Sequence, residues 1–381
     1  MNGLAEVSTP AIDTSALPGP AQRMLADNAP APLRMMAAKG IAPGLKPDAI
    51  VTLVCAFAQS SDAELAQTAR QTLENFPEPL LQGALATDLQ PRVLELLAEA
   101  HHMESSVVIR LLAARQITSR ALELVAQQAN EAIGEVVAAS DSVLLRFPRV
   151  IEKLYMNKRV RMSTADRLVD LAVRNNLELN IPAFKQAVAA IQNQLIPEPT
   201  EEPAFDDELF KQVEQLSEQM PSEVEEDTHE LNDEGQEELK RKFQPLYAQL
   251  GNMTVSQKIR RATLGTGVER MLLVRDRNRL VASAAAQSPM LKENEATLIA
   301  ASRSVIDDVL RIIAQNKDFT RLHQVKLNLV CNPRTPFTFS SRLIPLLRDS
   351  DLKMLSKSKN VPGAIQTAVR QQLDRKKKDK D

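Results

Sequence analysis

An internal repeat of 28 residues is the feature that most constrains how this chain folds. Residues 92–98 read Arg-Val-Leu-Glu-Leu-Leu-Ala, and residues 120–126 read Arg-Ala-Leu-Glu-Leu-Val-Ala. Most of the paired positions are identical, and a weaker third copy is expected around residues 136–139. A period of this length accommodates two short helices and two tight turns. One such pair cannot bury its apolar face alone, so the pairs must stack on one another.

The composition favours helices throughout. The 381 residues include only 11 glycines and no tryptophan, and aromatic residues make up 3%. A chain that is poor in glycine and aromatic residues is unlike a β-sandwich or a barrel. We therefore predict an all-α, HEAT-like helical-repeat solenoid in two blocks that are joined by an acidic flexible linker.

Local signals divide the chain into five parts. They are a disordered tail (1–20), an N-terminal repeat block (21–196), an acidic linker (197–238), a basic C-terminal repeat block (239–373) and a charged tail (374–381). In the first block, Ser61 and Glu64 are spaced as a capping box. The helix that follows is expected to carry Leu65, Ala69 and Leu73 on one face.

The second block has its own helix-boundary signals. Thr254 and Gln257 are spaced as a capping box. Thr335 precedes Pro336, which predicts a threonine cap with proline at the first helical position. Ser288-Pro289 and Asn332-Pro333 lie 44 residues apart and are typical of turns between helices.

These patterns resemble those of bacterial HEAT-like α-solenoid proteins of an uncharacterised family. The resemblance is carried by the 28-residue pair and by residues 276–278, 329–333 and 355–362, and it covers most of residues 21–196 and 250–373. It implies a scaffold or adaptor with an extended binding surface. It supplies no catalytic residues.

The acidic linker differs sharply from both blocks. Residues 197–238 contain 17 acidic residues and one basic residue. Such a segment buries too little apolar surface to fold alone, which predicts disorder. Apolar residues nevertheless recur there at helical spacing, at Phe205, Leu209, Phe210, Val213 and Leu216. This amphipathic helix either docks on its own chain or inserts into the groove of a protein partner.

Positive charge gathers in the C-terminal block. Residues 239–381 contain 28 Lys and Arg against 12 Asp and Glu. A basic face could bind nucleic acid or another polyanion, and the alternative binding set is Arg275, Arg277, Arg279, Lys376, Lys377 and Lys378. The other readings are ordinary solvated helix faces, a lysine tail that aids solubility, or an intramolecular partner that the acidic linker masks.

No motif predicts an enzyme, a cofactor or a metal. The spacings of His101, His102, His229 and His323 do not suggest a metal site. Gly265-Thr266-Gly267 lacks the following Lys-Ser/Thr of a phosphate loop and reads as a turn. The two cysteines, the absence of a signal-peptide pattern and the absence of a long apolar run predict a cytoplasmic protein without membrane insertion. We expect a non-enzymatic scaffold or adaptor that binds another macromolecule.

Overall fold

The all-α prediction is confirmed. The computed structural model describes residues 11–191, 205–221, 224, 226–232, 234–358 and 361–378. Within these ranges the chain forms 25 α-helices and one two-stranded hairpin. It divides into two compact units, residues 1–179 and residues 180–381. None of the described helices combines the length and apolarity needed to cross a bilayer.

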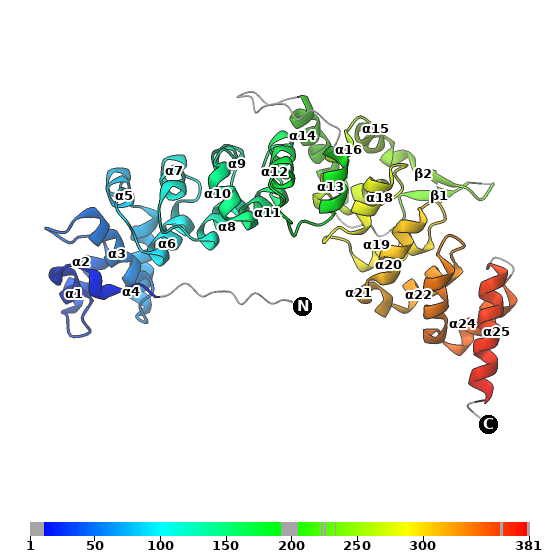
Figure 1. Cartoon of the computed structure of the whole chain (residues 1–381). Coiled ribbons are helices and arrows are strands. Elements are labelled where there is room, and N and C mark those ends of the chain that lie inside the picture. The colour runs from blue at the N-terminus through cyan, green and yellow to red at the C-terminus, as the bar shows by residue number, and fades with distance from the viewer. Residues whose placement is uncertain are drawn as a thin grey trace. The chain divides into compact units, whose positions relative to one another are not determined.

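The N-terminal unit is a stack of antiparallel helix pairs. Its elements are η1 (Thr14–Ala16), α1 (Gly19–Leu25), α2 (Ala31–Ala38), α3 (Pro47–Ala58), α4 (Ala63–Glu74), α5 (Glu78–Leu85), α6 (Pro91–His101), α7 (Ser105–Ala113), α8 (Ser119–Gln128), α9 (Glu131–Ala138), α10 (Asp141–Arg146), α11 (Pro148–Met156) and α12 (Met162–Arg174). One layer contains α4, α6, α8 and α11, and the other contains α5, α7 and α9 (Figure 1). Each helix packs on the next helix of its own layer.

The predicted repeat corresponds to α6 and α8, and a third copy lies in α11. Residues 149–155, Arg-Val-Ile-Glu-Lys-Leu-Tyr, occupy the register of residues 92–98 and 120–126. The same four positions are buried in each copy: Val93, Leu94, Leu97 and Ala98; Ala121, Leu122, Val125 and Ala126; Val150, Ile151, Leu154 and Tyr155. The predicted third copy at 136–139 instead falls in α9, which belongs to the opposite layer. The extra helix α10 shifts the true copy downstream, which explains the difference.

The ends of this unit also differ in detail from expectation. Asp62, rather than Ser61, caps α4 by accepting from the backbone N–H groups of Glu64 and Leu65. The face of α4 is as predicted, because Leu65, Ala69 and Leu73 are buried. Part of the predicted N-terminal tail is ordered. The backbone of Asp13 exchanges two hydrogen bonds with the side chain of Gln90.

The C-terminal unit begins earlier than the boundary at 196 that the sequence suggested, because α13 packs on α16 and α18. Its elements are α13 (Phe184–Ile191), α14 (Phe205–Glu218), β1 (His229–Leu231), β2 (Glu237–Leu239), η2 (Arg241–Phe243), α15 (Gln244–Gly251), α16 (Val255–Leu264), α17 (Gly267–Leu273), α18 (Arg279–Ala286), α19 (Glu293–Ala301), α20 (Asp307–Gln315), α21 (Lys317–Arg321), α22 (His323–Cys331), α23 (Phe337–Leu343), η3 (Ile344–Leu346), α24 (Asp349–Lys357) and α25 (Gly363–Lys378). The helices α16, α18 and α20 follow one another in one row, while α19 packs on α22. The last helix, α25, extends into the predicted charged tail.

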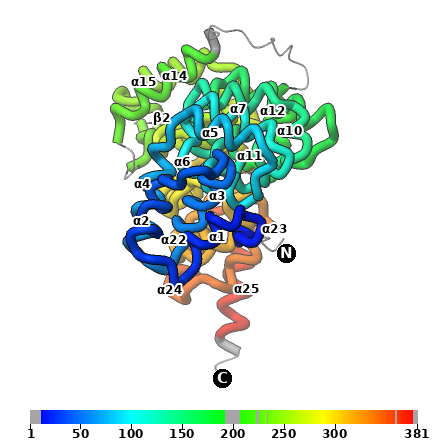
Figure 2. Tube along the Cα trace, turned by 90° about the vertical axis from the view of Figure 1, so that its left-hand side faces the viewer, coloured from blue at the N-terminus to red at the C-terminus, as the bar shows by residue number. Residues whose placement is uncertain are grey.

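Much of the segment at 197–238 has regular structure where the charge predicted a disordered linker. Helix α14 lies beside α15 in two perpendicular views (Figures 1 and 2). Farther along, β1 and β2 pair antiparallel, with Glu230 opposite Glu238. The turn between the strands uses Gly235 at φ +73°, a backbone conformation that favours glycine. Apolar residues spaced among the acids, and pairing of some acids with arginines, provide the folding energy that composition alone does not reveal.

Helix caps in this unit follow the sequence in one case and not in another. Thr254 and Gln257 form the predicted capping box at α16. At α23, the helix begins after Pro336, and Thr335 makes no side-chain cap bond. The hydroxyl of Thr335 is buried instead. Proline therefore takes the cap position that the sequence assigned to threonine.

Both units use an asparagine to tie one repeat to the preceding one. In the N-terminal unit, Asn157 Nδ2 donates to the carbonyl oxygens of Ala126 and Ala129 at 3.0 and 2.8 Å. In the C-terminal unit, Asn332 Nδ2 donates to those of Ala300 and Ser302 at 3.0 and 2.7 Å. These carbonyls lie at or just past the ends of helices, where no intrahelical donor remains. We call Asn157 and Asn332 the asparagine clamps.

Candidate functional site

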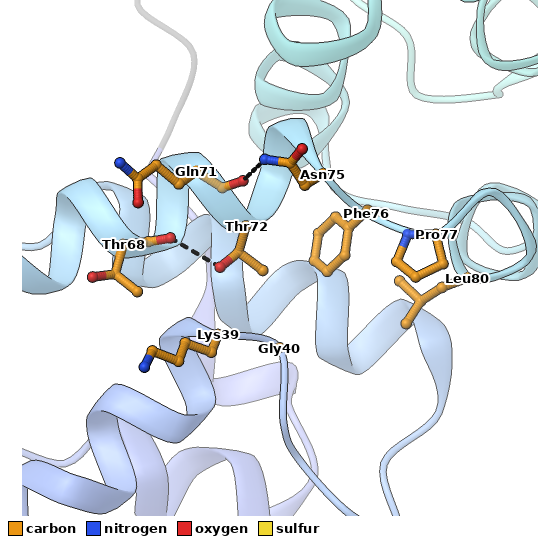
Figure 3. Close-up of a pocket in the computed structure, with 9 residues that line it drawn as sticks. All are labelled: Lys39, Gly40, Thr68, Gln71, Thr72, Asn75, Phe76, Pro77 and Leu80. Atoms are coloured by element: carbon orange, nitrogen blue, oxygen red, sulfur yellow. Dashed lines mark hydrogen bonds between the residues drawn. The ribbon is translucent and has the colours of Figure 1, made fainter.

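The first hollow in the N-terminal unit lies where the ends of α2 and α4 meet the start of α5. Its volume is about 460 Å³, and it is lined by Lys39, Gly40, Thr68, Gln71, Thr72, Asn75, Phe76, Pro77 and Leu80. Figure 3 shows polar side chains from α4 along one side, with Phe76 and Leu80 at the other. Two local bonds order that polar side, from Thr72 Oγ1 to the Thr68 carbonyl and from Asn75 Nδ2 to the Gln71 carbonyl.

Gly40 shapes the wall of this hollow. Its φ of +72° is readily adopted only by glycine, and a Cβ there would lie 3.2 Å from Phe76 Cε1. The close approach holds the Phe76 ring between the turn and α4. The hollow is therefore a preformed feature of the backbone rather than a gap between mobile side chains.

The second hollow crosses the ends of three helices in the same layer. Its volume is about 520 Å³, and it is lined by His102, Met103, Gln127, Gln128, Met156, Asn157, Lys158 and Arg159. These residues come from the C-terminal ends of α6, α8 and α11. Met103 is 44% exposed, so a thioether as well as amides and cations faces solvent there.

The two hollows are related by the repeat. Gln127 in the second hollow stands 56 residues, or two periods, after Gln71 in the first. Met103 stands 28 residues after Asn75, and Arg159 stands 84 residues after it. Equivalent positions of successive repeats thus line both hollows. We call this surface, formed by the C-terminal ends of α4, α6, α8 and α11, the repeat edge.

The repeat edge has a consistent chemistry. Neither hollow is lined by an aspartate or a glutamate, and Lys39, Lys158 and Arg159 supply cations. Glutamine and asparagine amides supply donors and acceptors, while methionines adapt their shape to irregular apolar groups. Such a set can hold a peptide by its backbone and by apolar or acidic side chains.

The predicted partner-binding helix is packed within its own unit. Leu209, Phe210 and Val213 of α14 are buried, and Leu216 is half-buried. The Phe210 ring lies under the guanidinium of Arg261, 4.9 Å from its centroid. The side chain of Phe205 lies outside the described residues. This burial corresponds to the alternative in which the helix docks on its own chain.

Beneath α14 lies a network of buried ion pairs. Arg261 donates from Nε and Nη2 to Glu269 Oε1 at 2.8 and 2.5 Å. Arg270 donates to both oxygens of Glu295 at 2.9 and 2.8 Å. All four residues are at most 3% exposed. The network connects α16, α17 and α19 and offers no open surface to a ligand.

The turn at Gly265-Thr266-Gly267 closes this network. Thr266 caps α17 in a capping box with Glu269. A Cβ on Gly265 would lie 2.1 Å from Glu269 Oε2, and one on Gly267 would lie 2.8 Å from Glu295 Oε1. Both glycines are required because ion-pair carboxylates occupy the space of a side chain.

The predicted basic set does not form one free surface in the described residues. Arg275 binds Asp227 with its Nη2 at 2.9 and 2.7 Å. Arg279 pairs with Asp308, and Lys376 pairs with Asp349 at 2.8 Å. Arg277 is exposed. The side chains of Lys377 and Lys378 lie outside the described residues.

Arg275 belongs to a second polar cluster, which the hairpin completes. Glu237 on β2 accepts from the hydroxyls of Ser302 and Ser304 at 2.7 and 2.6 Å. It also accepts from the backbone N–H of Arg303 at 2.7 Å. Burial acts to raise the pKa of Glu237, but these hydrogen bonds and Arg275 lower it to about 2.

The remaining chemical groups show no catalytic arrangement in the described part of the chain. Cys55 and Cys331 are free thiols, and burial raises the pKa of both. No group of three or more histidine, cysteine or carboxylate side chains that could hold a metal ion is present among the described residues. His101 is occupied by the Leu73 carbonyl and Glu104.

Comparison with protein-family models, with curated proteins and with solved structures finds no match to this chain. The resemblance to HEAT-like solenoid proteins therefore stays a prediction. The sequence analysis found the repeat but missed the repeat edge. The signal was present in the 28-residue spacing of polar residues just after the apolar stripe, which becomes legible once the helix ends are known.

Proposed function

We propose that this chain is a non-enzymatic scaffold whose N-terminal unit binds an extended segment of a partner protein along the repeat edge. One observation carries the proposal: two separate hollows are lined by equivalent positions of successive repeats. Helical-repeat proteins bind extended partners in this manner, because stacking generates a continuous surface from one repeated position.

The chemistry of the edge supports a peptide rather than a compact small molecule. The hollows lie in the open ends of the helix layer, and amides at repeat spacing suit the regular spacing of a peptide backbone. Cations without lining carboxylates favour an acidic residue on the partner. Exposed methionine favours an apolar residue beside it.

The free thiols support a reducing compartment, and we place this scaffold in the cytoplasm on that basis. Nucleic-acid binding by the C-terminal unit is not favoured by a specific contact, since Arg275, Arg279 and Lys376 are engaged by carboxylates of the same chain.

Selection of a displayed library of short random peptides on the full-length chain tests the proposal. Selected peptides should bind the Met103→Glu/Arg159→Glu variant at least about tenfold more weakly than the original protein, measured by fluorescence anisotropy. The changes place negative charge within the second hollow and remove one of its cations.

The matched control is Ile109→Glu/Arg110→Glu on α7, which makes the same chemical change at two exposed positions of the opposite layer. It should leave affinity within about twofold of the original. Selected peptides that bind both variants equally well, or a selection that enriches no peptide, would show that the repeat edge is not the binding surface.

A further inference from the structure

A compact set of donors in the C-terminal unit surrounds the carboxylate of Glu237. The set consists of the Arg275 guanidinium, the Ser302 and Ser304 hydroxyls and the backbone N–H of Arg303, and we call it the carboxylate nest. Three hydrogen bonds of 2.6–2.7 Å reach the two oxygens of Glu237. Arg275 Nε lies 3.5 Å from the same carboxylate.

The nest is built by the helical body and not by the hairpin that fills it. Arg275 is oriented by Nη1 donating to the Met271 carbonyl at 2.9 Å and by Nε donating to Ser304 Oγ at 3.0 Å. Ser302 and Ser304 hydroxyls also lie 3.0 Å apart and hydrogen-bond each other. The donors would therefore keep their places if Glu237 left, which is the preorganisation expected of a binding site.

The next repeat fixes the loop that carries the serines. The asparagine clamp Asn332 holds the Ser302 carbonyl, and Arg334 Nη1 lies 3.2 Å from the Val305 carbonyl. Backbone N–H groups and hydroxyls fixed in this way bind anions without reorganising. Departure of the hairpin would leave Arg275, whose side chain is 5% exposed, facing solvent with an unpaired charge.

The hairpin is attached mainly through its acids. Asp227, just before β1, makes two bonds to Arg275, and Glu237 fills the nest. Strands β1 and β2 are three residues each, and Leu231 at the tip is 70% exposed. A short two-stranded hairpin is marginally stable by itself. Its position therefore depends on contacts that another carboxylate could replace.

We infer that the carboxylate nest is a binding site for an acidic strand of a partner protein, and that the chain's own hairpin fills it until such a strand displaces the hairpin. The occupant in the structure is itself an extended acidic strand, so its chemistry identifies the ligand class. This site lies in the C-terminal unit and does not depend on the repeat edge.

Opening the hairpin by mutation tests the inference in the full-length chain. The probe is a fluorescent synthetic peptide with the sequence of residues 226–240. In the original protein it competes with a tethered copy of itself at high effective concentration, so it should bind weakly. The Asp227→Asn/Glu237→Gln variant removes the competing carboxylates, and the probe should bind it at least about tenfold more tightly.

Two further variants fix the location. Glu230→Gln/Glu238→Gln removes the same charge from a facing pair on the hairpin that makes no contact with the nest, and it should bind the probe as weakly as the original. Adding Ser302→Ala and Ser304→Ala to the opened variant should abolish the gain. Hydrogen exchange should quicken at β1 and β2 while α18–α20 stay protected. If α18–α20 also lose protection, the single variant Glu237→Gln takes the place of the double one, with the same expected outcomes.

Three results would overturn the inference. The opened variant could bind the probe no more tightly than the original. The gain could survive loss of both serines. A single-stranded oligonucleotide or inorganic phosphate could gain as much as the peptide, which would make the nest a general anion site and not one for an acidic strand.

Discussion

The two units share an architecture but differ in what joins their helices. Each uses an asparagine clamp across a turn, Asn157 in one and Asn332 in the other. The N-terminal unit fills the space between α6, α8 and α11 with apolar side chains at equivalent positions. The C-terminal unit instead buries two arginine–glutamate pairs between α16, α17 and α19. Apolar packing tolerates repetition, whereas each ion pair needs two particular partners. This difference explains why the repeat is legible in only one unit.

The largest expected difference follows from removing one member of a buried pair. Glu295→Ala leaves Arg270 as an uncompensated buried charge, and it should destabilise the C-terminal unit by about 3–5 kcal/mol. Glu131→Ala breaks the partly exposed pair of Glu131 with Arg161 in the N-terminal unit and should cost about 1 kcal/mol. Hydrogen exchange resolved by helix measures both, because a chain of two units need not unfold in one step.

An apolar replacement of the whole pair sharpens this test. Arg270→Met/Glu295→Leu removes both charges, so it should destabilise less than Glu295→Ala alone. A double variant that is as unstable as the single one would show that the pair supplies packing or shape that methionine and leucine cannot.

The apolar stripe was predictable from sequence because helical burial has a fixed period. Leu65, Ala69 and Leu73 lie buried on one face of α4 as that period requires, and Thr254 and Gln257 make the expected capping box. Asp62 rather than Ser61 caps α4, because two neighbouring residues were both suitable caps and the chain direction decides between them.

The candidate sites were less predictable because they depend on pairing between distant residues. Composition marked Glu237 as part of a solvated acidic run, yet hydroxyls 65 and 67 residues away bind it. Composition also marked Arg275 as free positive charge, while Asp227, 48 residues before it, neutralises that charge. Net charge sums over a segment and cannot reveal which charges meet. The masking alternative identified the right signs without identifying these contacts.

The asparagine clamps give a second and smaller contrast. Asn→Ala leaves two helix-end carbonyls without their donor, which costs about 1–3 kcal/mol when they are buried. Asn332 is buried and Asn157 is half-buried, so Asn332→Ala should destabilise its unit more than Asn157→Ala destabilises its own. Chemical denaturation followed by helix-resolved hydrogen exchange checks the order. Equal losses would mean that water replaces the donor as readily in one unit as in the other.

The smallest effect is a response to pH that only the C-terminal unit should show. The pKa of Glu237 in the docked hairpin is about 2, below its usual 4.5, so docking is fully stabilised above about pH 4.5 and weakens as pH falls toward 2. Burial and Arg275 lower the pKa of His229, although Asp227 and Glu237 oppose this, so its contribution begins to be lost below its usual 6.5. Acid weakens docking in both cases.

A fluorescent label at Leu231→Cys measures this response in a Cys331→Ser background, because Leu231 lies at the exposed tip of the hairpin. Its anisotropy should stay flat from pH 8 to 6.5, begin to fall below 6.5 and fall most below 4.5. Glu237→Gln should remove the largest fall, since glutamine does not titrate. A label at Ile109→Cys, which is 54% exposed on α7, reports the N-terminal unit and should stay flat while that unit is folded. A hairpin signal that rises on acidification, or that changes only together with the Ile109 label, would mean that Glu237 and His229 do not control docking.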